Sequence, residues 1–90
     1  MNLQTALFNW LQIKTVADAR PTDEAAKKTV DFFAEILRDD HKLTHFEVTT
    51  SDATMYHVSY ELSGVKKKQM FDRETVEQLL HDINAEPKYN

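Results

Sequence analysis

Apolar residues recur at helical spacing near the start of the chain. Between residues 2 and 19 they cover one arc of roughly 160° of a helical wheel, which predicts a first helix. Phe8 and Val16 are apolar but lie outside that arc. If the helix packs only through its arc, both side chains stay exposed, and we therefore expect them to contact a partner. The arc itself consists of Leu3, Ala6, Leu7, Trp10, Leu11, Ile13 and Ala17.

A second helical pattern follows Pro21, which blocks continuation of the first helix. Thr22 is the predicted N-cap, and Asp23 and Glu24 place negative charge in the first turn, where the helix dipole favours it. The pattern runs to about Arg38. Its apolar arc is wide, which predicts contact with both a sheet and the first helix.

After a polar connector at residues 39–42, the apolar period changes from helical to alternating. Three alternating runs, at residues 46–50, 56–62 and 65–71, predict three strands. Ser63-Gly64 lies between the last two and contains the only glycine of the chain. A two-residue turn there pairs His57 with Met70, Ser59 with Lys68 and Glu61 with Lys66.

The first hairpin has to bring the apolar sides of its strands to one face. An odd-numbered loop of three or five residues puts Phe46 and Val48 on the face that carries Val58, because each one-residue shift of register exchanges the faces. We therefore predict an odd loop. Beyond the third strand, Asp72 is the predicted cap of a third helix, and Phe71 and Val76 stand at the positions of a hydrophobic staple.

This order predicts an α+β fold: helix, helix, three strands and helix (α-α-β-β-β-α). The strands should form a three-stranded antiparallel meander with the helices packed on one face, in two layers. Residues 1–86 should form a single compact domain, and residues 87–90 a frayed tail.

Composition removes several classes of function. One glycine cannot supply a glycine-rich phosphate loop or a dinucleotide fingerprint, and no cysteine is present for a disulfide, a thiolate metal site or a nucleophile. The cysteine-free sequence and the lack of a long apolar run favour a cytoplasmic protein without a membrane span. A net charge of −4 disfavours nucleic acid as a partner. We expect no cofactor.

Two groups of side chains could carry chemistry. His41, His45 and His57 are weak candidates for a metal site, because imidazoles suit transition metals but a dedicated site needs converging ligands. Ser59 stands between His57 and Glu61, yet neighbours on one strand face are about 7 Å apart and cannot form a catalytic triad. The sequence therefore favours a protein that is not an enzyme.

The lysine run at residues 66–68 splits between the two faces of a strand. Lys66 and Lys68 share the outer sheet face with His57 and Ser59, and together they could bind nucleic acid. Alternatively, the lysines protect an edge strand against pairing with another sheet.

By elimination, we predict a small non-catalytic protein-interaction or regulatory module of bacterial type. Its partner is another protein or a second copy of itself, because the first strand carries no lysine and offers an edge for strand addition or symmetric dimerisation. The predicted interaction residues are Phe8, Val16, His57, Ser59, Lys66 and Lys68. The alternatives are a nucleic-acid-binding module and a metal-dependent activity at the three histidines.

Overall fold

The computed structural model describes residues 1–86, and the expectation for residues 87–90 lies outside this range. Its elements follow the predicted α-α-β-β-β-α order. They are α1 (Leu3–Ala19), α2 (Glu24–Glu35), a π-helical turn η1 (Ile36–Asp40), β1 (Leu43–Ser51), β2 (Met55–Leu62), β3 (Val65–Asp72) and α3 (Arg73–Ala85).

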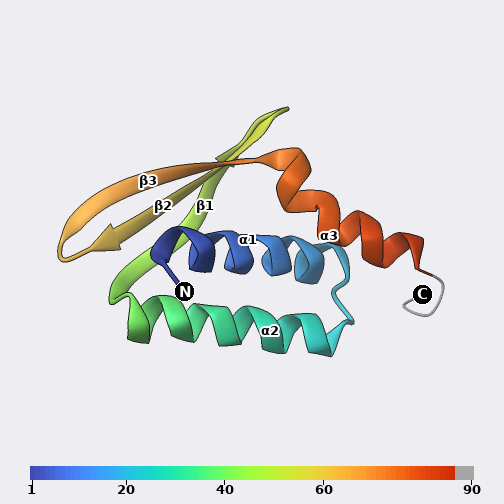
Figure 1. The fold of residues 1–90 in the computed structure, drawn as a ribbon, viewed down its shortest axis with the longest axis horizontal. Coiled ribbons are helices and arrows are strands. Elements are labelled where there is room, and N and C mark those ends of the chain that lie inside the picture. Colours follow the sequence, from blue (N-terminus) through green and yellow to red (C-terminus); the bar gives the residue numbers. More distant parts are fainter. Residues whose placement is uncertain (87–90) are drawn as a thin grey trace.

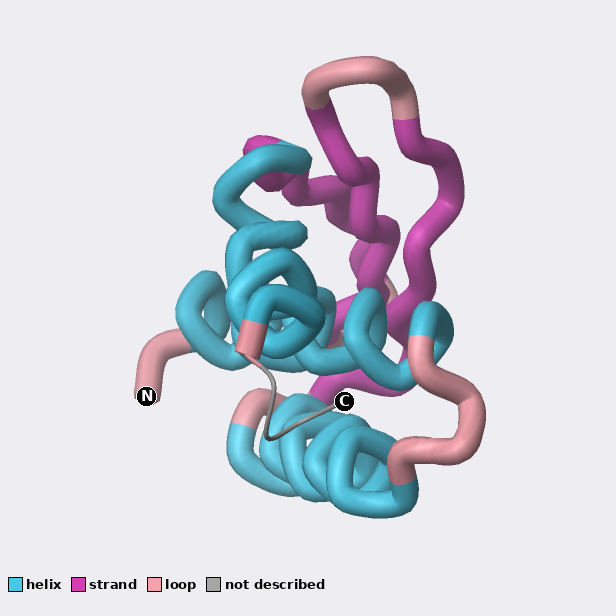
Figure 2. Tube along the Cα trace, turned by 90° about the vertical axis from the view of Figure 1, so that its right-hand side faces the viewer, coloured by secondary structure: helices cyan, strands magenta, loops and turns pink. Residues whose placement is uncertain are grey.

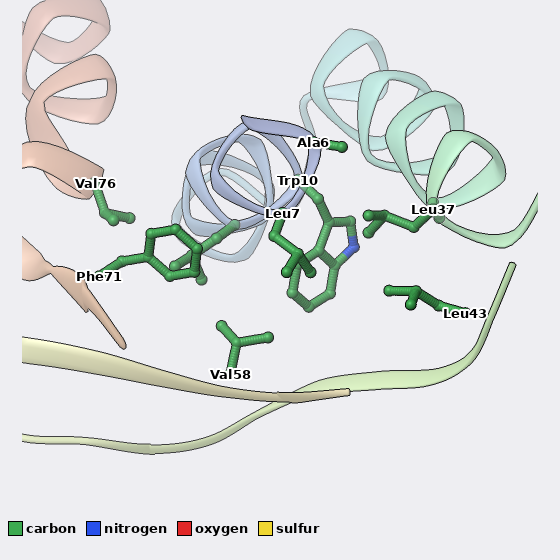
Figure 3. Close-up of a cluster of buried hydrophobic side chains, with 10 residues drawn as sticks. Ala6, Leu7, Trp10, Leu37, Leu43, Val58, Phe71 and Val76 are labelled. Atoms are coloured by element: carbon green, nitrogen blue, oxygen red, sulfur yellow. The ribbon is translucent and has the colours of Figure 1, made fainter. Parts of the chain in front are cut away.

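The strands form one antiparallel sheet in the order β1-β2-β3, so that β1 and β3 are its edges within the described chain. The helices pack against one face of this sheet (Figures 1 and 2). Figure 3 shows α1 between α2 and α3, directly above the strands. The predicted α+β class and its two layers are therefore confirmed.

The start and the end of α2 differ from the prediction. Asp23, and not Thr22, is the N-cap, because its carboxylate accepts a hydrogen bond of 3.0 Å from the backbone N–H of Ala26. At the other end the helix continues as the π-helical turn η1 to Asp40. The predicted connector at residues 39–42 is therefore partly helical.

The start of α3 is as predicted. The carboxylate of Asp72 caps the helix by accepting from the backbone N–H of Thr75 at 2.9 Å and from its hydroxyl at 2.8 Å. Phe71 and Val76, the predicted staple, are both buried in the core. Because Phe71 belongs to β3, the staple fixes the direction in which the chain leaves the sheet.

The β2–β3 hairpin confirms the predicted two-residue turn. Leu62 pairs with Val65 across it, and every predicted pairing along the hairpin follows. Ser63 and Gly64 have φ values of 53° and 77°, and positive φ at both central residues is what a type I′ turn requires.

In the β1–β2 hairpin, the apolar residues lie on the predicted face, but a bulge is needed to place them there. Phe46 pairs with Tyr60 and Val48 with Val58, so the apolar residues share the inner face as expected. Three residues, 52–54, lie between the two strands. Ser51 pairs with Tyr56, so the register at the turn is that of a four-residue loop, and it is the one-residue shift between Val48 and Thr50 that brings the apolar residues to the inner face.

The core lies between α1 and the sheet (Figure 3). Trp10 meets Phe46 of β1 edge to face, with ring centroids 5.2 Å apart. Val58, at the centre of the sheet, is fully buried below α1. Leu37 from η1 and Val76 from α3 close the core at its two sides.

Candidate functional site

Phe8 and Val16 are not the exposed apolar residues that the sequence indicated. Val16 is fully buried, and Phe8 is half-buried with its ring centroid 6.1 Å from that of Phe71. The expectation was wrong because it allowed α1 one packing face, whereas α1 packs against α2, α3 and the sheet. Both side chains therefore contribute to packing within the fold.

The outer sheet face carries the other predicted interaction residues, and none of the helices α1 to α3 covers it (Figure 1). Ser59 pairs with Lys68 and His57 with Met70, which puts the four predicted residues on one face. A shallow hollow of about 380 Å³ lies along this face. Its charged lining combines bases and acids: His45, Glu47, Glu61, Lys66, Lys67 and Lys68.

The three histidines of the metal hypothesis do not converge. His45 lies opposite Glu61, four residues along β2 from His57, which corresponds to about 13 Å of strand. His45 approaches Glu47 at 3.3 Å instead, and His57 approaches Asp52 at 3.2 Å. Among residues 1–86, no group of three or more His, Asp or Glu side chains could hold a metal ion.

Asp52 organises the β1–β2 turn, a role that sequence reasoning missed. Its carboxylate accepts hydrogen bonds from the backbone N–H groups of Thr54 at 2.9 Å and Met55 at 2.7 Å. The backbone N–H of Thr54, the His57 imidazole and the N–H of Met55 together hold the pKa of the Asp52 carboxyl well below its usual range. An Asp two residues before a Thr in a turn was the available signal.

A second cluster ties this turn to α3. The hydroxyl of Tyr56 donates to Glu77 at 2.5 Å, and Nε of Arg73 donates to the same carboxylate oxygen at 3.2 Å. Another Arg73 nitrogen donates to the backbone carbonyl of Asp52 at 2.8 Å. Burial, and then the neighbouring Glu77 carboxylate, raise the pKa of Tyr56. The cluster therefore keeps the far end of the β1–β2 hairpin next to the helices.

A groove of about 640 Å³ opens between β1, α1 and α3, and nothing in the sequence pattern predicted it. Its walls are largely apolar, with charged groups at Lys14, Asp18, Glu47 and Glu77. Lys14 and Asp18 neutralise each other at 3.1 Å. The apolar wall residues are Trp10, Leu11, Ala19, Phe46, Val48 and Leu80.

The free edge of β1 borders this groove, because Phe46 and Val48 line it from the strand. β1 contains no lysine and no proline, whereas the opposite edge strand, β3, carries Lys66, Lys67 and Lys68. Lysines and prolines are common means of protecting an edge strand. β1 has its register irregularities, on either side of residues 45–48, and the exposed Glu47. We call this edge and the adjoining groove the β1 surface.

Comparison of the chain with protein-family models, curated proteins and solved structures finds no match. Within residues 1–86, no helix combines the length and the apolar character needed to cross a bilayer.

Proposed function

We propose that the chain is a small, non-catalytic protein-interaction or regulatory module that associates through the β1 surface. The proposal rests on one observation: β1 is both an edge strand and a wall of an apolar groove. An edge strand without lysine or proline has unpaired backbone groups on its outer side within the described chain. The same strand lines an apolar groove, in which side chains of an added strand can be buried.

The two edges of the sheet differ in the way this proposal requires. β3 presents three consecutive lysines, all exposed, which oppose the addition of a further strand. In β1, between its two irregularities, the exposed residues are His45 and Glu47, and Phe46 and Val48 are half-buried. Association is therefore favoured at β1 and disfavoured at β3.

The proposal of a non-catalytic role is supported by the surroundings of His57. This imidazole and the Glu61 carboxylate each stand two residues from Ser59 along β2. The Nε2 of His57 lies 3.2 Å from Asp52, and its Nδ1 is buried without a hydrogen-bond partner among residues 1–86. Neither nitrogen is thus available to take a proton from a substrate bound at the surface.

A second candidate function is binding of nucleic acid to the outer sheet face. The observation in its favour is that Lys66 and Lys68 are exposed there, beside Ser59. Glu47 and Glu61 line the same hollow and would repel phosphate, which makes this the weaker proposal. Retention of mixed DNA or RNA at low salt, lost in a Lys66→Glu, Lys68→Glu variant, would favour it over the β1 surface.

A matched pair of valine substitutions tests the leading proposal. Val48→Lys adds a lysine to β1, and Val65→Lys adds one to β3, where the native side chain is 55% exposed. For each variant, we would measure the mass in solution and the proteins captured from cells that express the chain. We expect Val48→Lys to abolish self-association or capture of a partner and Val65→Lys to preserve it.

Thermal unfolding of both variants shows whether the chain remains folded, since Val48 packs partly against the core. The proposal would be contradicted if the wild-type chain neither associates with itself nor captures any protein in a way that depends on Val48. Equal loss in two folded variants would also contradict it.

A further inference from the structure

We propose that two copies of this chain pair through β1 in antiparallel orientation, with Phe46 of one copy opposite Phe46 of the second copy. The inference rests on the proposed function and names the partner at the β1 surface. Such a pair would join two three-stranded sheets into one continuous sheet. The interface would use the same residues from both copies, as a two-fold axis requires.

The alternation of β1 restricts the register of this pairing. In a continuous antiparallel sheet, residues directly opposite each other lie on the same face, so a symmetric pair must be centred on a residue. The regular part of β1, between its two irregularities, runs from His45 to Val48. The centres available inside it, away from its ends, are Phe46 and Glu47.

Charge distinguishes these two centres. A pair centred on Glu47 places the two Glu47 carboxylates directly opposite each other, and like charges in that position are destabilising. A pair centred on Phe46 places His45 of each copy opposite Glu47 of the other. In the single chain, these side chains are 57% and 56% exposed and only 3.3 Å apart, so both are accessible on the outer face.

The inner face of the pair is apolar at the same register. Phe46 is half-buried, meets Trp10 edge to face, and has the Arg38 guanidinium 5.7 Å above its ring. A second Phe46 opposite the first would bury the remaining ring surface, and aromatic pairs are among the favourable cross-strand pairs. Phe46 also lines the apolar groove, so the second copy would lie beside that groove.

A charge-swap experiment tests both the pairing and its register. In His45→Glu, the introduced carboxylate faces Glu47 of the second copy, and in Glu47→Lys, the introduced ammonium group faces His45 of the second copy. Each variant alone should therefore dimerise at least about tenfold more weakly than the wild-type chain, because both outer-face pairs of the dimer are lost. An equal mixture should recover dimers, since the introduced carboxylate of one variant then faces the introduced ammonium group of the other.

Sedimentation velocity over a range of concentrations measures the dissociation constants. Lys68→Glu is the control, because it reverses a charge on the same outer face but on β3, at the opposite edge of the sheet. It should leave the dissociation constant unchanged. Recovery in the mixture separates pairing between chains from loss of the contact between His45 and Glu47 within one chain, which no mixing can restore.

A wild-type chain that is monomeric at every concentration overturns the inference, as do single variants that dimerise normally. Weakened single variants without recovery in the mixture overturn the register centred on Phe46. The proposed function is judged separately, because a monomeric chain that captures another protein in a Val48-dependent way would still be an interaction module.

Discussion

The guanidinium of Arg73 lies over the ring of Tyr56, 5.1 Å from its centroid. The same guanidinium donates hydrogen bonds to Glu77 and to the backbone carbonyl of Asp52. Arg73, in the first turn of α3, thus contacts the β1–β2 turn, strand β2 and the next turn of its own helix. These contacts hold the turn that follows β1 against α3.

Loss of the Tyr56 hydroxyl should weaken this connection. We expect Tyr56→Phe to lower the free energy of unfolding by about 1 to 2 kcal/mol, because a half-buried carboxylate loses a donor. Tyr60→Phe is the matched control on the same strand and the same inner face. Urea unfolding of both variants provides the comparison, and an equal effect would contradict the role given to Tyr56.

Asp52 should make stability depend on pH in the acidic range. Its folded-state pKa is lowered, so the ionised carboxylate stabilises the fold above the unfolded-state pKa of about 3.9 and loses this effect as the pH falls below it. Asp52→Asn keeps an oxygen that accepts hydrogen bonds but removes the titration.

The measurement is the difference in unfolding free energy between wild type and Asp52→Asn. We expect this difference to shrink as the pH falls from about 5 toward 3. A difference that grows toward low pH would show that the sign is wrong.

Substitutions at the two residues of the Ser63-Gly64 turn should change stability in opposite directions. A Cβ added at Gly64 would have no heavy atom of residues 1–86 within 4 Å, so Gly64→Ala costs only backbone strain at φ 77°, about 1 kcal/mol. Ser63→Asn should instead stabilise the hairpin by about 0.5 kcal/mol, because Asn-Gly is preferred in type I′ turns. Thermal unfolding of both variants provides the test. Gly64→Ala should lower Tm and Ser63→Asn should raise it, and Tm shifts in the same direction would contradict the requirement for positive φ.

Substitution of Phe8 should lower the stability of the fold without a direct effect on association. Phe8→Glu puts a carboxylate against Phe71 and the core, and we expect a loss of about 2 kcal/mol or more. Phe32→Glu changes a phenylalanine that is 57% exposed on α2 and should cost little. Similar unfolding free energies for the two variants would contradict the packing of Phe8.

The sheet and the third helix were predictable because their signals are local. Gly64 marks the turn, alternation sets the faces, and Asp72 with Phe71 and Val76 marks the helix start. The burial of Val16 was not predictable from its own helix, since it depends on two further helices on either side of α1. A helical wheel contains no information on how many neighbours a helix has.

The candidate site was predictable only in part. The absence of lysine from the first strand can be read from the sequence, and it remains the starting point of the proposal. The groove beside this strand arises where α1, α3 and β1 meet, and the contact between Arg73 and Tyr56 joins residues 17 positions apart. Such features depend on tertiary packing, which residue spacing along the chain does not reveal.

Hydrogen exchange along β1 tests the central claim most directly. The backbone amides of residues 45–48 should be compared at low and at high protein concentration, with the amides of β3 as the internal reference. If the chain associates with itself through the β1 surface, amides of residues 45–48 will exchange more slowly at high concentration while those of β3 do not change. Concentration-independent exchange throughout β1, or slowing confined to β3, would contradict self-association through the β1 surface.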